Sequence, residues 1–268
     1  MIPFIKMSGA GNDFVIFDGR KTPVQLTSDK IKEISDRKNI GCDQLIIIKD
    51  STQADCLMEI YNSDGSLSGA CGNATRCVAS ILMNEKNHRK VKIKTAAGIL
   101  KCWKSGDLIS VDMGIPSFEA SKIPLSDEID SQKILLHNFE FACVNVGNPH
   151  AVTFLSKALS DKEFFDIGPK VECDFIFPKK TNVEFAQILS DDLIEVRVWE
   201  RGAGETMACG SGACAVAILA IKKNLLQKNK VITRFKGGDL AIEWNGKGSA
   251  VIMTGGYEHM GSGEIDND

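Results

Sequence analysis

The sequence contains few of the features that mark metal-binding or disulfide-stapled proteins. Its 268 residues include nine cysteines but no C-x-x-C pair, and its four histidines are scattered along the chain. A structural zinc site is therefore not expected. An odd number of cysteines without a close-spaced framework indicates reduced thiols, as in a cytoplasmic protein.

Long apolar runs and an excess of one charge are also missing. The run GACAVAILAI is too short to span a bilayer, and the start MIPFIKMSGAGNDF lacks the apolar region of a secretory signal. The formal net charge of −3 offers no electrostatic footprint for nucleic acid or an anionic membrane. We therefore expect neither nucleic acid nor a membrane as a partner.

The sequence does contain an internal repeat. Adding 138 to the residue number takes Cys71 to Cys209, Asn62 to Glu200 and Gln44 to Asn182. With a slip of two residues, GNDFVIF at Gly11 matches GNPHAVTF at Gly147. A collinear series of matches indicates a duplicated domain.

Both halves show the same order of patterns. Three apolar or alternating stretches, FVIF, LIII and CLMEIY in the first half, predict strands. A glycine-rich loop then opens a helix, which after Cys209 is apolar nearly all round and is expected to be buried. The sequence thus predicts an α+β fold of two pseudo-symmetric duplicated domains, each a β-barrel-like mixed sheet around a central helix.

The repeat also predicts the domain boundaries. The first repeat is expected to cover residues 1–115 and the second residues 116–256, with the stretch 115–124 as the linker. The tail 257–268 is expected to pack back on the first repeat. A duplicated protein tends to form its cleft between the halves, so we expect the active site there.

A cysteine opens the helix in each half. The first N–H groups of a helix are unpaired and carry partial positive charge, which predicts a lowered thiol pKa for Cys71 and Cys209. The alternative is that both are small core residues, the usual fate of a free cysteine. The repeated glycine-rich context favours reactive thiols, whereas Cys77 and Cys214 are interpreted as core residues.

Two facing thiols, one ionised and one protonated, would form a two-base device. One takes a proton from a carbon and the other returns a proton to the opposite face, which inverts a stereocentre. No cofactor or metal is needed if hydrogen bonds and helix ends stabilise the carbanion.

Several motifs carry a resemblance to a known family. They are GAGNDF at 9–14, NSDGSLSGACGNATRC at 62–77, GNPH at 147–150, TNVEF at 181–185 and ERGAGETMACGSGA at 200–213. In these motifs the chain resembles the diaminopimelate epimerases. The resemblance implies a cytoplasmic, cofactor-independent isomerase that interconverts L,L- and meso-2,6-diaminopimelate, on the route to lysine and peptidoglycan precursors. The resemblance is also compatible with a homodimer.

The resemblance also implies residue roles. Cys71 and Cys209 would be the proton-transfer pair, and His150 and Glu200 would tune the thiols. The substrate-binding set would be Asn12, Gln44, Asn62, Gly72, Asn73, Asn148, Asn182, Glu200, Arg201, Gly210 and Ser211. Two departures are Ala74, where the family usually has glycine, and Ser8, where histidine is common.

Other interpretations remain open from the residues alone. Asn12, Asn148 and Asn182 could serve as turn residues, and Arg201 beside Glu200 could be a surface pair. A dicarboxylic substrate nevertheless needs a cation, and arginine holds a carboxylate with two bonds. Rival functions are a proline racemase relative, a thiol–disulfide oxidoreductase and a non-catalytic amino-acid-binding protein.

Overall fold

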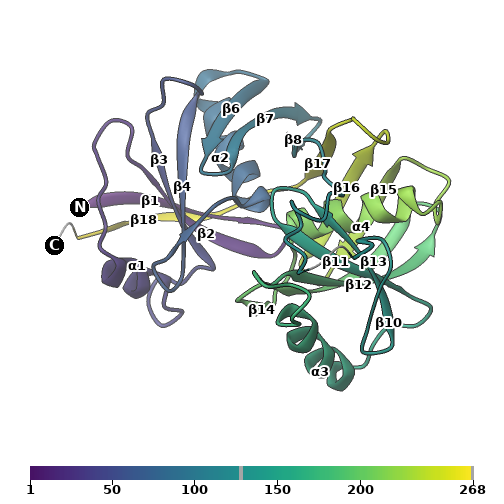
Figure 1. Cartoon of the computed structure of the whole chain (residues 1–268). Helices are drawn as coiled ribbons and strands as arrows, with labels where there is room; N and C mark the ends of the chain where they lie inside the picture. The colour runs from purple at the N-terminus through teal and green to yellow at the C-terminus, as the bar shows by residue number, and fades with distance from the viewer. Residues whose placement is uncertain (127–128, 267–268) are drawn as a thin grey trace. The chain divides into compact units, whose positions relative to one another are not determined.

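The computed structural model describes residues 1–126 and 129–266 (Figure 1). Contacts divide the chain into two units, Met1–Asp112 with Thr254–Asp268, and Met113–Met253. The first boundary thus lies a few residues before the one expected at 115, and the second a few residues before 256. The strand β17 (Val251–Gly255) contains the second boundary.

The first unit consists of strands around one long helix. Its strands are β1 (Ile2–Gly9), β2 (Asn12–Asp18), β3 (Gln44–Lys49), β4 (Cys56–Asn62), β5 (Leu67–Ser68), β6 (Lys90–Thr95), β7 (Gly98–Ser105), β8 (Leu108–Asp112) and β18 (Glu258–Ile265). Its helices are α1 (Ser28–Ser35) and α2 (Gly72–Lys86), and α2 packs against β1, β6, β7 and β8. Asn87, in the left-handed conformation, ends α2.

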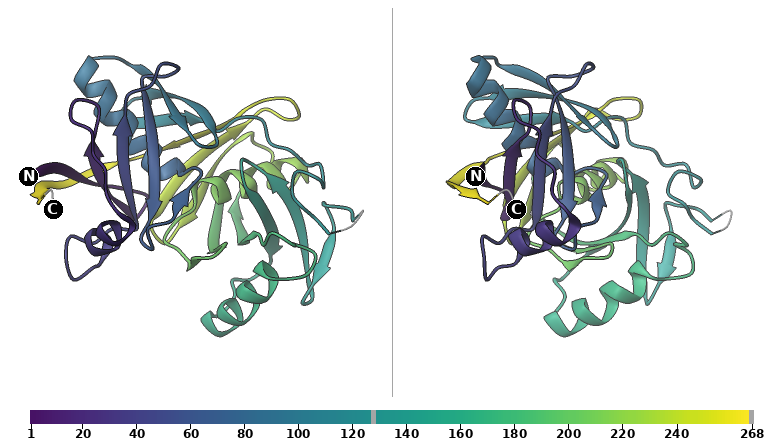
Figure 2. Two further views of the ribbon diagram at one scale, coloured as in Figure 1. Left: turned by 60° about the vertical axis from the view of Figure 1, so that its left-hand side comes forward. Right: turned by 90° about the vertical axis from the view of Figure 1, so that its left-hand side faces the viewer.

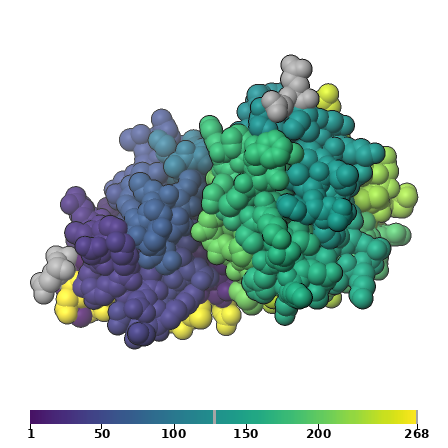
Figure 3. Space-filling model, turned by 60° about the horizontal axis from the view of Figure 1, so that its bottom comes forward, coloured from purple at the N-terminus to yellow at the C-terminus, as the bar shows by residue number. Residues whose placement is uncertain are grey.

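The C-terminal strand belongs to the first unit. β18 pairs antiparallel with β1, with Ile265 opposite Ile2 (Figure 2). In the space-filling view, yellow C-terminal residues lie against purple N-terminal ones (Figure 3). The last strand therefore covers what would otherwise be the open edge of β1.

The second unit repeats this plan. Its strands are β9 (Ile134–Leu136), β10 (Phe139–Asn145), β11 (Pro149–Leu155), β12 (Asn182–Ser190), β13 (Leu193–Glu200), β14 (Gly204–Glu205), β15 (Lys230–Phe235) and β16 (Gly238–Trp244). Its helices are α3 (Asp161–Glu172), which begins with a capping box at Ser160, and α4 (Gly210–Lys222). α4 is buried against β10, β11, β12 and β16, because nearly all of its side chains are apolar.

Strand pairing confirms the duplication. The parallel pair β2–β3 corresponds to β11–β12, and the antiparallel pair β3–β4 corresponds to β12–β13. The register agrees as well, since Phe14 lies opposite Gln44 and His150 lies opposite Asn182. Because the backbone repeats in this way, residues at matching positions occupy the same local geometry in each unit.

Candidate functional site

Each of the two cysteines is the N-cap of its helix. Cys71 has extended backbone angles, and its Sγ accepts the Ala74 N–H at 3.5 Å. Cys209 does the same at α4, where its Sγ accepts the Gly212 N–H at 3.4 Å. The predicted position of a thiol at a helix mouth is therefore confirmed in both repeats. Cys77 and Cys214 are completely buried, as expected of core residues.

The thiol of Cys209 differs from the prediction in its pKa. Burial raises the pKa of Cys209 well above its ordinary value, and the nearby carboxylates of Glu200 and Glu184 raise it further. Hydrogen bonds from Ser211 and the Gly212 amide act in the opposite direction and are outweighed. The prediction of a lowered pKa is therefore wrong for Cys209, because the helix N-terminus competes with desolvation and two negative charges.

Glu200 lies beside this thiol. Burial raises the pKa of Glu200, against hydrogen bonds with Thr206 and Cys209 that favour the carboxylate. Thr206 Oγ1 donates its bond to Glu200 Oε1. A carboxyl group and a thiol with raised pKa values, in hydrogen-bond contact, can hold and pass on a proton.

His150 lies on β11 and is completely buried. Its Nδ1 lies 2.6 Å from Glu184 Oε1, and its Nε2 lies 2.9 Å from Asn148 Oδ1. Glu184 is also completely buried, and its Oε2 has no hydrogen-bond partner among the described residues. The imidazole is thus held at both nitrogens, by Asn148 just before β11 and by Glu184 on β12.

Gly212 allows Glu184 to approach α4. A Cβ at Gly212 would lie 2.8 Å from Glu184 Oε1 and 3.4 Å from Cys209 Sγ. The contact with Glu184 is shorter than a side chain tolerates, so any larger residue at position 212 would displace the carboxylate. Because Gly212 has no side chain, the Glu184 carboxylate and the Cys209 sulfur can both lie close to this position.

Arg201 lies in a tight turn after β13. The Ala203 N–H bonds the carbonyl of Glu200, and Gly202 has the positive φ of 78° that a type II turn requires at its third residue. Asn182 Oδ1 accepts the Arg201 N–H at 2.9 Å. Asn182 therefore stabilises this turn. The fixed backbone of the turn restricts the directions that the Arg201 side chain can take.

Glu172 fixes the same turn from the end of α3. One of its oxygens accepts the Gly202 N–H at 2.9 Å, and the other accepts the Trp199 indole N–H at 2.8 Å. Lys180 Nζ lies 3.3 Å from the first oxygen. Burial opposes the charge of Glu172, but these partners outweigh it and leave its pKa below the ordinary value.

We expect Glu172→Gln to destabilise the second unit at neutral pH by about 1–3 kcal/mol, since buried donors lose a charged acceptor. A lowered native pKa gives stability that is complete above the unfolded-state pKa and lost as the pH falls through the native one. The difference between wild type and variant, measured by urea unfolding, should therefore shrink in acid. If the stability difference stays the same below both the native and the unfolded-state pKa of Glu172, the charge of Glu172 is not what stabilises the turn.

The first unit assembles the other half of the predicted set. Gln44 and Asn62 are opposite each other on β3 and β4, and Gln44 Nε2 donates to Asn62 Oδ1 at 3.0 Å. Asn73 Nδ2 donates to Asn12 Oδ1 at 2.6 Å. The first unit thus holds two hydrogen-bonded pairs of predicted site amides, besides Cys71 at the start of α2.

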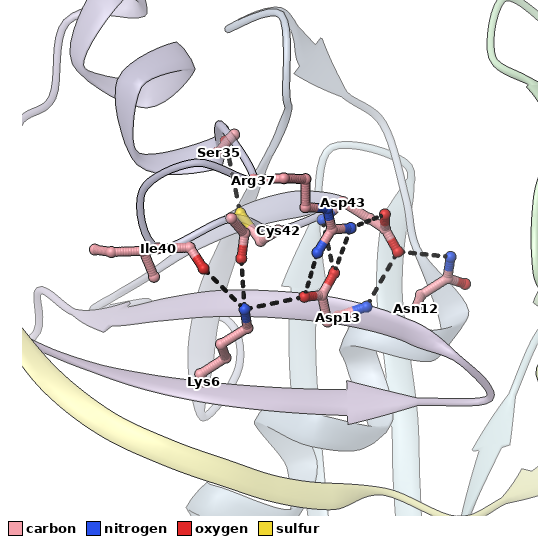
Figure 4. Close-up of polar contacts among 9 residues, drawn as sticks. Lys6, Asn12, Asp13, Ser35, Arg37, Ile40, Cys42 and Asp43 are labelled. Atoms are coloured by element: carbon pink, nitrogen blue, oxygen red, sulfur yellow. Dashed lines mark hydrogen bonds and ion pairs between the residues drawn. The ribbon is translucent and has the colours of Figure 1, made fainter.

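A charged cluster supports Asn12 (Figure 4). Asn12 Nδ2 donates to Asp43 Oδ2 at 3.2 Å, and Arg37 bonds both Asp13 and Asp43. Lys6 adds an ion pair to Asp13 at 3.2 Å. Burial works against the Asp13 charge, but the bonds from Arg37 and Lys6 outweigh it and lower the Asp13 pKa.

Sequence reasoning missed several residues that support the predicted ones. They are Arg37, Asp43, Arg76, Glu172 and Glu184. Two had a readable signal, since Arg76 is a charged residue among small and apolar residues of α2, and Glu184 is one between apolar residues of β12. Such charges are rarely buried without a partner.

Within residues 1–126 and 129–266, no cluster of histidine, cysteine and acidic side chains has the arrangement of a metal site. Among these same residues, no helix has the length and apolarity that crossing a bilayer requires.

Solved structures share the fold at low sequence identity. A hydroxyproline epimerase from Agrobacterium vitis superposes with a TM-score of 0.67 at 15% identity, over 100% of this chain and 93% of that one. A phenazine biosynthesis protein of the PhzF family from Bacillus anthracis gives a TM-score of 0.68 at 14% identity, over 99% of both chains. Both similarities establish the predicted two-domain fold.

Closer similarity appears at the level of sequence. The family model for diaminopimelate epimerase matches residues 4–119 and 142–260. The diaminopimelate epimerase of Acidiphilium cryptum is 43% identical over 98% of this chain and 96% of its own length. That of Methanococcus maripaludis is 40% identical over 98% of this chain and 99% of its own. With matches of this extent, the chain belongs to the diaminopimelate epimerase family.

Proposed function

We propose that the protein is a cofactor-independent isomerase that interconverts L,L-2,6-diaminopimelate and meso-2,6-diaminopimelate. The observation that carries this proposal is the pair of repeat-equivalent cysteines, each capping a helix with its sulfur bonded to the first turn. Neither disulfide chemistry nor simple binding explains why the thiol and its helix geometry occur twice. A proton donor and a proton acceptor on opposite faces of one carbon do explain it.

In the proposed reaction, Cys71 and Cys209 act on the same carbon of one substrate molecule. The Cys71 thiolate removes the α-proton of the L,L isomer, and the Cys209 thiol delivers its own proton to the opposite face of the same carbon. The raised pKa of Cys209 supports this assignment, because it keeps the donor protonated before the substrate binds. In the reverse direction the two residues exchange roles.

Backbone amides would stabilise the carbanion between these two steps. Gly72 and Gly210 are the first residues of α2 and α4, where N–H groups point out of the helix and favour negative charge. Asn73 and Ser211 follow them. The α-carboxylate, which gains electron density when the α-proton leaves, is the group these amides would bind.

The other end of the substrate would contact the turn that carries Arg201. Its Nη1 donates to the Lys179 carbonyl at 3.3 Å, which leaves the remaining guanidinium donors able to hold a carboxylate. Glu200 and the amides of Asn62, Asn148 and Asn182 would contact the adjacent polar groups. A substrate with an amino-acid centre at each end would suit these polar groups. The proposed enzyme would act in the cytoplasm, in the synthesis of lysine and peptidoglycan precursors.

The direct test is to incubate purified protein with L,L-diaminopimelate, without added cofactor, and to separate the stereoisomers. We expect the meso isomer to form, at the same rate after dialysis against a chelator and treatment with a carbonyl reagent. L-proline and trans-4-hydroxy-L-proline, offered in parallel, should remain unchanged. Inversion of either imino acid instead of diaminopimelate would identify a proline racemase relative, and binding without inversion would identify a binding protein.

A further inference from the structure

Two asparagine side chains in the first unit form a chain of hydrogen bonds that ends in a charge at each side. At one end, the Arg76 guanidinium donates from Nη1 to Asn73 Oδ1 at 3.0 Å. Asn73 Nδ2 donates to Asn12 Oδ1 at 2.6 Å, and Asn12 Nδ2 donates to Asp43 Oδ2 at 3.2 Å. We call the four residues Arg76, Asn73, Asn12 and Asp43 the amide relay.

The two charged ends determine which way each amide points. A guanidinium can only donate, so the Asn73 atom beside Arg76 must be the oxygen. A carboxylate can only accept, so the Asn12 atom beside Asp43 must be the nitrogen. Each end alone leads to the same orientation for both amides, and reversing either amide would bring two donors or two acceptors into contact.

Both ends of the relay are themselves held. Arg76 is completely buried in α2, and its Nε donates to the Gly256 carbonyl at 3.1 Å. Asp43 accepts from Arg37 Nη2 at 2.6 Å and from the Asp13 amide at 3.1 Å (Figure 4). Because both ends are held by further hydrogen bonds, the orientation is transmitted to Asn73, which is 2% exposed, and to Asn12 at the start of β2.

We propose that Asp43 and Arg76 are positioning residues that lock the amide orientation of Asn12 and Asn73, so that Asn12 presents an N–H donor to the substrate. The inference rests on the proposed function, in which Asn12 contacts the substrate. Asn12 Nδ2 carries two hydrogens, and Asp43 takes one of them. The second is directed at an oxygen of the ligand, and a carboxylate oxygen is the acceptor that diaminopimelate supplies.

The decisive variant is Asp43→Asn, which keeps the shape of the side chain but replaces one acceptor with a donor. We expect KM for L,L-diaminopimelate to rise by at least about tenfold with a smaller change in kcat. An asparagine at position 43 must either offer a donor to Asn12 or turn its amide nitrogen towards Arg37, and both arrangements weaken the hold on Asn12. The matched control is Asp50→Asn, an exposed aspartate just after β3. It should leave both constants unchanged.

A second variant separates positioning from structure. In the double variant Asn12→Asp/Asp43→Asn, the carboxylate at position 12 can accept from position 43 and from Asn73 Nδ2, so the chain of hydrogen bonds is satisfied again. We expect its thermal unfolding midpoint to recover towards that of wild type while KM stays raised, because position 12 no longer has a donor. Recovery of KM together with the midpoint would overturn the proposal, as would a wild-type KM in Asp43→Asn.

Failure of the proposed function would look different. Wild-type protein that does not epimerise diaminopimelate would refute that function, and the relay would then be judged by the side-chain amide NMR signals of Asn12 and Asn73. These signals should shift in Asp43→Asn and stay in place in Asp50→Asn. Signals that respond equally in both variants would overturn the relay.

Discussion

Cys209→Ala is expected to slow epimerisation of L,L-diaminopimelate by at least about a thousandfold, within the range that a general acid contributes. The variant retains the Cys71 base but has no proton to deliver to the opposite face. Loss of the N-cap costs only about 1 kcal/mol, so the protein should remain folded. Cys71→Ala should be equally inactive, because each direction needs one base and one acid.

The control and the isotope experiment make this prediction specific. Cys173→Ser, which replaces an exposed cysteine at the end of α3, should retain wild-type activity. In heavy water, early product from wild type should carry deuterium at the inverted carbon while recovered substrate stays largely unlabelled. Near-normal epimerisation by Cys209→Ala, or the original proton in the product, would rule out the two-base reaction.

The second large effect is expected at Glu184. Replacing it with alanine should destabilise the protein by about 3–5 kcal/mol, the usual result of removing one partner from a buried pair. His150, 2.6 Å away and completely buried, would lose its acceptor at Nδ1. Activity should fall as well, because a negative charge that raises the Cys209 pKa is removed and His150 is free to turn.

Urea unfolding measures the first effect and initial rates the second. Glu195→Ala is the matched control, since Glu195 is an exposed carboxylate on the neighbouring strand β13. It should unfold at nearly the wild-type urea concentration and retain activity. If Glu184→Ala behaves in the same way, the His150–Glu184 contact has no energetic role.

Much of the fold was predictable because the sequence is duplicated, so that each half supports the interpretation of the other. The 138-residue offset links Gln44 to Asn182 and Asn62 to Glu200, and both pairs lie at equivalent strand ends. The caps at Cys71 and Cys209 followed from glycine-rich sequence before an apolar run. These are local features, which a sequence specifies directly.

The supporting charges were not predictable in this way. Glu172 reaches Gly202 across 30 residues, and Arg76 reaches Gly256 across 180. Such contacts depend on tertiary packing, which no local pattern encodes. The prediction of a lowered pKa for Cys209 was wrong for the same reason. The helix terminus can be recognised in the sequence, whereas the burial of the thiol and its proximity to Glu184 cannot.

The glycine at position 212 also shows where the two halves have ceased to be interchangeable. Its repeat counterpart is Ala74, and the counterpart of Glu184 is the completely buried Ile46. The first half has Phe14 where the second has His150. Two apolar residues, Phe14 and Ile46, therefore stand where the second half has the ionisable residues His150 and Glu184. A methyl group is therefore harmless at position 74 and excluded at position 212. Mutational tolerance should follow this difference, with position 74 open to small residues and position 212 restricted to glycine.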